Sequence, residues 1–341
     1  MKKEMKRYLF LIILITLVSN LNCLAQEAYA IHTKSDSTLT FYYDTNMNKR
    51  SGWSCDLELS VFEGKPKWWS NILNDEINNI TTVVFDSSFA NYKPTTMYCW
   101  FAGKKKLRTI KGMENLNTSH VSNMGWLFGD CESLKEIDLS HFNTIRVEAM
   151  NGMFMNCKSI DTLILKNFNT SYVKNMDRMF EGCSNLKYID LSYFETSSLS
   201  NFNNMFCDCS SLTNLDLSNF DTESATQMVS MFSGCSNLEV LNITSFNTRK
   251  VEFMDHMFSR CTSLKTIDLS SFETPNLKYI EGMFYDCNNL KTIIVGKGWT
   301  KSNIKLRYST SVFRNCFMLI GEKGTTYSES RISASYAQID R

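Results

Sequence analysis

The sequence predicts an α/β repeat solenoid, with a continuous parallel β-sheet along one side and short helical segments on the opposite side. Two observations carry this prediction. A 26-residue period recurs along most of the 341-residue chain, and each period contains one segment with strand alternation and one with helical spacing. The composition is that of an ordinary globular protein, with 43% hydrophobic and 21% charged residues. It excludes a disordered chain and a multi-pass membrane protein.

The period is clearest in the cysteines. Seven of them occupy the same position in successive repeats, and an eighth comes three positions late in the next repeat: Cys131, Cys157, Cys183, Cys209, Cys235, Cys261, Cys287 and Cys316. Two phenylalanine positions and one threonine position keep the same interval. The whole unit reads V-x-x-M-x-x-M-F-x-x-C-x-x-L-x-x-L-D-L-S-x-F-x-T-x-x. Because so many positions repeat together, each unit is expected to have the same structure.

Each unit divides into two halves. In L-x-x-L-D-L-S, for example residues 186–192, apolar Ile189 and Leu191 flank polar Asp190, which predicts a short strand with one solvent-facing side. In V-x-x-M-x-x-M-F-x-x-C the apolar residues have helical spacing. The residue before the cysteine is Gly, Asn or Asp in seven of eight copies, and these residues tolerate the left-handed conformation that ends a helix. Where this helix begins is open, because the V-x-x-M part also fits an extended segment.

One strand and one short helix cannot bury their own apolar faces. Stacked units can, with neighbouring strands about 4.8 Å apart in a parallel sheet. Equivalent residues then form columns along the solenoid. We expect the Leu, Met, Phe and Cys columns to point inward, and the Thr and Ser columns to satisfy backbone groups at the turns.

Outside the repeat, the chain divides into terminal segments. Residues 1–25 combine a basic start, a short apolar run from Tyr8 to Val18 and Ala25 before the expected cleavage point, which predicts a secretory signal peptide. A membrane span would need about 20 apolar residues, so this run of 11 residues is too short to be one. Residues 26–96 are expected to form an N-terminal cap with strands near 39–44 and 80–86. Residues 97–320 form the solenoid of about eight units, and 321–341 its C-terminal cover.

The signal peptide predicts a secreted, extracellular or cell-surface protein with no membrane span in the mature chain. An alternative is a lipoprotein acylated at Cys23, although Asn22 fits that motif poorly. Removal of residues 1–25 takes away four Lys/Arg and one Glu, so the net charge changes from +1 to −2. A charge so close to zero argues against nucleic acid as a partner, because binding to phosphates needs a basic surface.

The repeat resembles that of the BspA-like leucine-rich-repeat surface proteins of bacteria, in the Bacteroidales-type version with a 26-residue unit. Residues 191–196 (LSYFET), 217–222 (LSNFDT) and 231–238 (MFSGCSNL) are close to its consensus. The resemblance implies a leucine-rich-repeat-like solenoid that mediates protein–protein binding at the cell surface. It also implies adhesion to host extracellular-matrix or cell-surface proteins of the fibronectin or fibrinogen kind, or to other cells. It supplies no catalytic residues.

The candidate partner-binding face is the solvent-facing position of the strands, which comprises Asp138, Ile164, Asp190, Asp216, Asn242, Asp268 and Ile294. Two interpretations are open. The stacked carboxylates keep the sheet soluble and protect it from aggregation, or they form a surface for a partner or cation on the concave sheet. Ile164 and Ile294 are apolar exceptions, and exposed apolar residues among polar ones can mark contacts.

The cysteines have a structural interpretation. Zinc sites need clustered C-x-x-C pairs or Cys with His, which the chain lacks, so each repeat cysteine is expected to be a small buried side chain whose S–H serves a turn carbonyl. The Met column is expected to fill the core, with a promiscuous binding surface as the alternative. Cys55 and Cys99 lie outside the column and are the candidate disulfide pair.

No cofactor, metal or catalytic residue is predicted. The four histidines, His32, His120, His141 and His256, have neither metal-ligand spacing nor a nucleophile in a known motif. The favoured function is therefore that of a non-enzymatic binding or adhesion protein. The alternatives are a self-assembling structural element of a surface layer and an enzyme with an unrecognised site. The sequence leaves the oligomeric state open.

Overall fold

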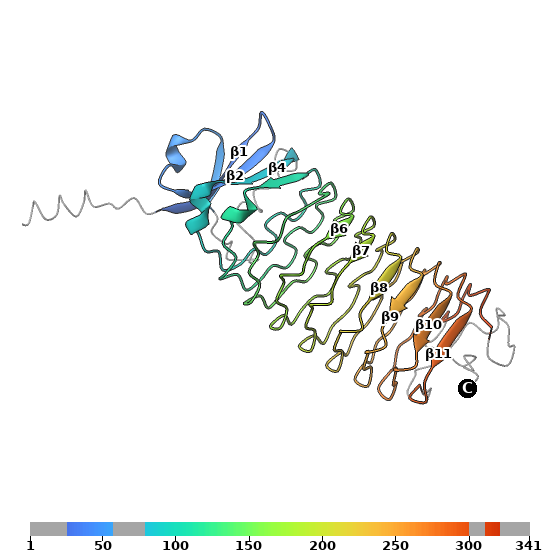
Figure 1. The fold of residues 1–341 in the computed structure, drawn as a ribbon. Helices are drawn as coiled ribbons and strands as arrows, with labels where there is room; N and C mark the ends of the chain where they lie inside the picture. The colour runs from blue at the N-terminus through green and yellow to red at the C-terminus, as the bar shows by residue number, and fades with distance from the viewer. Residues whose placement is uncertain (1–25, 57–78, 300–310, 321–341) are drawn as a thin grey trace, which may run out of the picture.

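The computed structural model of the chain describes residues 26–56, 79–299 and 311–320. Figure 1 shows a nearly straight stack of coils, with the N-terminal strands at one end and β11 near the other. The stack has about eight turns. The expected signal peptide, residues 1–25, and the expected C-terminal cover, residues 321–341, lie outside the described residues.

The N-terminal end is a five-stranded sheet that joins the solenoid directly. Its order is β3-β1-β2-β4-β5, in which β1 pairs antiparallel with β2 and β3, whereas β2–β4 and β4–β5 are parallel. The strands are β1 (Glu27–Thr33), β2 (Thr38–Asp44), β3 (Trp53–Asp56), β4 (Thr82–Phe85) and β5 (Thr109–Lys111), with short 3₁₀ turns η1 (Met47–Lys49), η4 (Ser87–Asn91) and η5 (Met113–Asn115). Because β5 already belongs to the first degenerate repeat, the parallel ladder of the coils begins inside this sheet.

The strands of the coils are shorter than the predicted continuous sheet requires. They pair in parallel by twos, β6–β7, β8–β9 and β10–β11, and each residue pairs with its equivalent in the next repeat, such as Leu163 with Ile189. Each strand ends early because a turn follows at once, closed for example by the N–H of Phe194 on the carbonyl of Leu191 at 2.9 Å. The six are β6 (Thr162–Leu163), β7 (Tyr188–Ile189), β8 (Asn214–Asp216), β9 (Val240–Asn242), β10 (Thr266–Leu269) and β11 (Thr292–Val295).

The helices predicted for the M-x-x-M-F segments are not confirmed, because in the described coils these segments fold into successive β-turns. The N–H of Met153 donates to the carbonyl of Met150 at 3.2 Å, and that of Cys157 to Phe154 at 3.0 Å. Between these turns, the N–H of Phe154 donates to the carbonyl of Met179 in the next coil at 2.9 Å. An α-helix needs each N–H for the carbonyl four residues earlier. Here every second N–H group donates instead to a carbonyl of the neighbouring coil.

The residue before each repeat cysteine does adopt the predicted left-handed conformation. Its φ lies between 55° and 76° in all eight copies, including Arg260, which the residue preferences did not favour. This conformation closes a β-turn and does not end a helix. A second left-handed position occurs four residues earlier in every coil, for example at Gly152 before Asn156. Two such positions four residues apart are incompatible with a continuous helix.

The V-x-x-M part is extended, and it forms a second parallel ladder of isolated bridges. These bridges run in two series, through Thr96, Asn123, Ala149 and Asn175, and through Asn201, Gln227, Phe253 and Tyr279. The extended alternative that the sequence left open at this point is therefore correct. The coils are held together along two sides by hydrogen bonds between equivalent positions.

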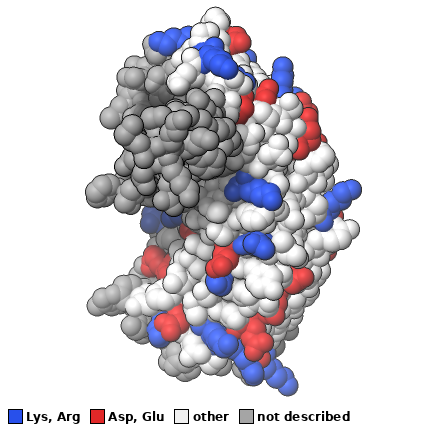
Figure 2. Space-filling model, turned by 90° about the vertical axis from the view of Figure 1, so that its left-hand side faces the viewer, with Lys and Arg blue, Asp and Glu red and all other residues white. Residues whose placement is uncertain are grey.

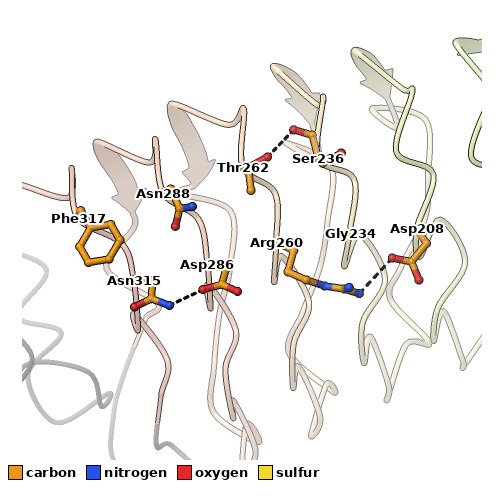
Figure 3. Close-up of a pocket in the computed structure, with 9 residues that line it drawn as sticks. All are labelled: Asp208, Gly234, Ser236, Arg260, Thr262, Asp286, Asn288, Asn315 and Phe317. Carbon is orange, nitrogen blue, oxygen red and sulfur yellow. Dashed lines mark hydrogen bonds and ion pairs between the residues drawn. The ribbon is translucent and has the colours of Figure 1, made fainter.

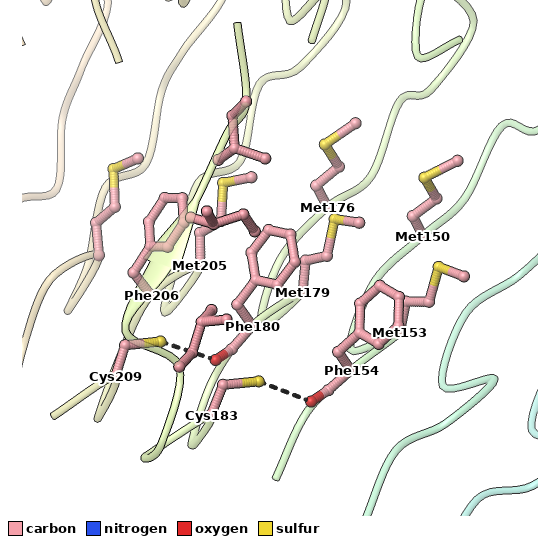
Figure 4. Packing of buried hydrophobic residues seen from close by; sticks show 14 of the residues in the cluster. Met150, Met153, Phe154, Met176, Met179, Phe180, Cys183, Met205, Phe206 and Cys209 are labelled. Carbon is pink, nitrogen blue, oxygen red and sulfur yellow. Dashed lines mark hydrogen bonds between the residues drawn. The ribbon is translucent and has the colours of Figure 1, made fainter. Parts of the chain in front are cut away.

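The core is built from columns of identical side chains. The first Phe column stacks nine rings in register, with centroids 5.4–5.9 Å apart and planes within 2–20° of parallel: Phe101, Phe128, Phe154, Phe180, Phe206, Phe232, Phe258, Phe284 and Phe313. The Met residues form two columns beside these rings, with Met150 and Met176 in one and Met153 and Met179 in the other (Figure 4), and all four are fully buried. The Met residues therefore fill the core, as predicted.

The Cys column has the predicted structural role. Each thiol donates to the carbonyl of a phenylalanine in the preceding coil at 2.9–3.2 Å, as Cys183 does with Phe154 in Figure 4. Burial raises the pKa of the Cys183 thiol to about 12, so it stays protonated. The side chain of Cys55 lies outside the described residues. Its pairing with Cys99 stays a prediction.

The Thr column satisfies backbone groups between coils, as expected. The hydroxyl of Thr144 donates to the carbonyl of Asn169 at 2.9 Å and accepts from the N–H of the same residue at 2.8 Å. Equivalent pairs recur at Thr118, Thr170, Thr222 and Thr248. The hydroxyl of Thr196 donates in the same way to the carbonyl of Asp221. Burial of a hydroxyl that has both a donor and an acceptor partner costs little free energy, because protein partners replace the hydrogen bonds that it made with water.

Candidate binding site

The seven residues of the predicted partner-binding face lie in one column along the coils. Five are exposed and two, Asn242 and Asp268, are half-buried. Six of them lie within the strands β6–β11 or directly after them, and Asp138 occupies the same position in a coil to which no strand is assigned. The inward neighbours on either side, such as Ile189 and Leu191 around Asp190, are buried. The strand alternation that the sequence showed therefore places this column on the surface.

The carboxylates of this column have a structural task that the sequence interpretation missed. Oδ1 of Asp190 accepts the N–H of Ser192 at 3.0 Å, which forms the turn that ends the strand. The same bond recurs at Asp138, Asp216 and Asp268 at 2.8–3.0 Å, and more weakly at Asn242 at 3.4 Å. The signal was present in the sequence. Every Asp or Asn of the column is followed two residues later by Ser or Thr, whereas Ile164 and Ile294 are not.

These hydrogen bonds also keep the column charged. The hydroxyl and N–H of Ser140 hold the pKa of the Asp138 carboxyl below its usual value. The N–H of Ser192 and that of Ser218 act in the same way on the pKa of Asp190 and Asp216. The carboxylates of Asp138, Asp190 and Asp216 are therefore ionised at neutral pH, and their hydrogen bonds hold them in fixed orientations.

The edge of the column carries charges of both signs, with the acidic Asp161 and Glu239 in two coils. Three residues before the Asp position, four coils carry an exposed Lys: Lys135, Lys187, Lys265 and Lys291. The face is thus mixed in charge and not uniformly acidic. Figure 2 shows a similar mixture on another side of the molecule, where Lys and Arg alternate with Asp and Glu among the atoms it colours. Such a surface does not concentrate a field of one sign.

Four large apolar side chains project from this polar surface. Ile164 and Ile294 belong to the predicted column, whereas Tyr188 and Val240 come from the position two residues earlier on the strand. Their exposed fractions are 44–66%. The sequence interpretation missed Tyr188 and Val240, although the alternation that exposes Asp190 also exposes Tyr188. We call the two exposed strand columns with the Lys edge the strand face.

The described part of the chain contains no cluster of metal-ligating side chains. Within residues 26–56, 79–299 and 311–320, no three His, Cys, Asp or Glu side chains come together in a way that could hold a metal ion. Of the histidines, His32 is buried in β1, and His120, His141 and His256 are exposed on separate coils. The same ranges contain no helix with the length and apolar character needed to cross a membrane.

Comparison with known families identifies the repeat. The family described as "Mycoplasma protein of unknown function, DUF285" matches residues 70–188, 128–241, 160–263 and 212–318, which together cover more than half of the chain. The chain belongs to the DUF285 family. DUF285 is a repeat family of the same kind as the BspA-like leucine-rich-repeat proteins, so the resemblance inferred from the 26-residue unit is confirmed. Membership of such a family supports a protein-binding role for the DUF285 solenoid.

Solved structures similar to this DUF285 chain include three bacterial leucine-rich repeat proteins. One from Bacteroides ovatus is 17% identical, with 86% of this chain and 80% of that chain covered and a TM-score of 0.44. One from Eubacterium ventriosum is 15% identical, with 90% of both chains covered and a TM-score of 0.28. One from Leptospira interrogans is 13% identical, with 72% of both covered and a TM-score of 0.25. No curated protein matches the chain.

Proposed function

We propose that this DUF285 protein is a non-catalytic binding protein that contacts protein partners through the strand face. The observation that carries the proposal is the set of exposed apolar side chains, Ile164, Tyr188, Val240 and Ile294, on an otherwise polar surface. Isolated Tyr and aliphatic side chains surrounded by polar groups are typical of residues that become buried in an interface. Solenoids present such residues along an extended surface, because each coil contributes one row.

The proposed location is outside the cell. The basic and apolar segments in residues 1–25 support export through a signal peptide, with acylation at Cys23 as the alternative. We further propose adhesion as the biological role, with host extracellular-matrix proteins of the fibronectin or fibrinogen kind, host surface proteins or other cells as partners. Protease treatment of intact cells tests the location. Loss of the repeats from intact cells supports it, whereas full protection until the cells are lysed contradicts it.

A triple variant tests the strand face as the contact surface. Ile164→Ser, Tyr188→Ser and Val240→Ser together remove three exposed apolar side chains without touching the core. We expect binding of the purified chain to immobilised fibronectin, fibrinogen or host cells to weaken by about tenfold or more, since buried contacts of this size contribute about 1–2 kcal/mol each. The matched control is Ile145→Ser with Tyr172→Ser, because both residues are equally exposed but lie away from the strands.

The outcomes separate the possibilities. Binding that is lost in the triple variant and kept in the control supports the strand face. Equal binding by parent, triple variant and control contradicts the strand face while leaving adhesion itself intact. No binding of the parent chain to any of the three targets contradicts the adhesive role.

A further inference from the structure

A groove of about 520 Å³ runs along the C-terminal coils, at the corner that precedes the strands. The residues directly before and after the buried cysteines Cys235, Cys261 and Cys287 line it. Figure 3 shows these side chains arranged in two parallel rows across successive coils. The groove lies on a different set of repeat positions from the strand face, so it is a separate surface.

The groove exists because several coils carry short side chains in a row. Ser236 and Thr262 follow their cysteines, whereas the same position is taken by Glu132 and Lys158 in the N-terminal coils, where these two form an ion pair at 3.3 Å. Gly234 also lines the groove and has no side chain to fill it. A Cβ atom at Gly234 would overlap Oδ1 of Asp208. Short residues in consecutive coils therefore leave open a corner that Glu132 and Lys158 fill in the N-terminal coils.

The polar groups in the groove are held in place by contacts between coils. Nη2 of Arg260 reaches across the coil of Gly234 to Oδ1 of Asp208 at 3.1 Å, and Nδ2 of Asn315 donates to Oδ1 of Asp286 at 2.5 Å. Both Arg260 and Asp208 remain about half exposed. A guanidinium has five N–H groups and a carboxylate has two oxygens, so each keeps capacity for a ligand. The groove thus offers oriented donors and acceptors with little loss of side-chain freedom on binding.

The backbone of the groove excludes strand addition by a peptide. The N–H groups of Gly234 and Arg260 already donate to the carbonyls of Ser259 and Tyr285 in the next coil, both at 2.7 Å. Strand addition requires an edge with unpaired backbone groups. Any ligand is therefore bound by side chains. Phe317, with 61% of its surface exposed, is the single apolar side chain among the nine that line the groove, so anchoring pockets for apolar peptide side chains are not formed.

The charge of the groove disfavours an anionic polymer. Its lining contains two carboxylates, Asp208 and Asp286, and one guanidinium, that of Arg260. Nucleic acids and sulfated polymers need a surplus of positive charge. The remaining polar groups are hydroxyls and amides, including the exposed Asn288. The composition therefore suits a ligand that is uncharged and rich in groups that both donate and accept hydrogen bonds.

We propose that this groove binds a neutral glycan chain. Arg260, Asp286 and Asn288 hydrogen-bond sugar hydroxyls, each of which donates and accepts as the groove requires. The ring of Phe317 packs against the apolar face of a sugar at one end, as exposed aromatic rings pack against flat C–H surfaces. The chain lies along the solenoid axis, because the groove is open and crosses several coils. Binding of this kind adds a glycan-recognition function on a surface separate from the strand face.

Affinity electrophoresis of the purified full chain in gels containing a neutral polysaccharide tests the proposal. The probes are four polymers of different sugars, namely a glucan, a mannan, a xylan and a galactan, with heparin and polylysine as charged comparators. We expect retardation by at least one neutral polymer. Thr262→Lys fills the groove and Asn288→Ala removes an exposed amide, and we expect each to weaken that retardation by about tenfold or more. Thermal unfolding verifies that both variants are folded.

Ser184→Lys is the matched control, because Ser184 occupies the same repeat position as Thr262 but does not line the groove. It places the same charge on the same column and is expected to leave retardation unchanged. Failure of all four neutral polymers to bind overturns the proposal. So does retardation by heparin or polylysine alone, which would indicate binding by charge. Equal loss in Thr262→Lys and Ser184→Lys overturns the groove as the site.

Discussion

The hydroxyl of Thr170 and the backbone of Glu195 exchange two hydrogen bonds across neighbouring coils. Oγ1 donates to the carbonyl oxygen at 3.0 Å and accepts from the N–H at 2.8 Å, and Thr170 is buried. The contact joins positions that are almost one full repeat apart in the sequence. It therefore couples the stability of one coil to that of the next, which is how repeat proteins acquire cooperativity.

Replacement of Thr170 tests this coupling. Thr170→Val keeps the shape of the side chain but leaves the N–H and C=O of Glu195 without their partner. We expect a loss of about 2–4 kcal/mol in the free energy of unfolding, because each buried unsatisfied group costs about 1–3 kcal/mol. Thr170→Ser keeps the hydroxyl and should cost less than half as much. Urea denaturation measures both, and equal stability of the Val and Ser variants would contradict the role of the hydroxyl.

Two glycines separate the cost of a left-handed backbone from the cost of a steric contact. Gly103 and Gly234 occupy equivalent repeat positions with φ of 77° and 76°. A Cβ atom at Gly103 meets nothing within 4 Å, whereas at Gly234 it would overlap Oδ1 of Asp208. We expect Gly103→Ala to cost about 1 kcal/mol from the backbone alone. Gly234→Ala should cost about 1–3 kcal/mol more, since it also displaces the carboxylate that pairs with Arg260. Thermal unfolding of the two variants would show similar losses only if the contact is unimportant.

The Asp column can be neutralised without loss of its turns. Asn242 naturally occupies this column and accepts the N–H of Thr244 through its side-chain oxygen. We therefore expect Asp190→Asn to retain the hydrogen bond to Ser192 and to change stability by less than about 0.5 kcal/mol, as a substitution that keeps its bond should. Asp190→Ala should cost about 1 kcal/mol, the usual contribution of one such bond. Chemical denaturation distinguishes them, and an Asn variant as unstable as the Ala variant would mean that the charge, and not the turn, stabilises this position.

The sequence predicted the columns of this fold better than its local conformation. The 26-residue register correctly placed the buried Cys, Met, Phe and Thr columns and the left-handed residue before each cysteine. It failed at the M-x-x-M-F segment, because successive β-turns return side chains to the core with nearly the same spacing as a helix. Spacing cannot show whether the N–H of Phe154 serves its own segment or the next coil. The residue types at the second left-handed position do not predict this conformation either, since Trp126 and Arg178 occupy it in two copies.

The candidate surfaces were predictable in part for the same reason. Strand alternation correctly predicted that Asp190 and its equivalents are exposed. Their role in forming the turn could have been inferred only from the Ser or Thr that follows two residues later. The groove could have been traced by aligning Gly234, Ser236 and Thr262 on the repeat register. Its polar bridge could not, because the reach of Arg260 over one coil to Asp208 depends on side-chain conformation. Single columns follow from sequence, whereas contacts between columns require the three-dimensional structure.

The buried thiols predict how stability depends on pH. Burial raises the pKa of Cys183 from 9.0 to about 12, so the folded chain holds this proton more tightly than the unfolded chain does. The stabilising contribution is therefore complete below about pH 9 and is lost as the pH rises from about 9 toward 12. In that window one such thiol contributes a slope of about −1.4 kcal/mol per pH unit to the free energy of unfolding. Cys183→Ala should lower the free energy of unfolding at pH 7.5. Above pH 9 it should also make the slope less negative by about 1.4 kcal/mol per pH unit, because the thiol that causes this part of the slope is gone. Urea titrations of both proteins at pH 7.5, 9 and 10.5 measure the difference, and parallel losses above pH 9 would contradict the raised pKa.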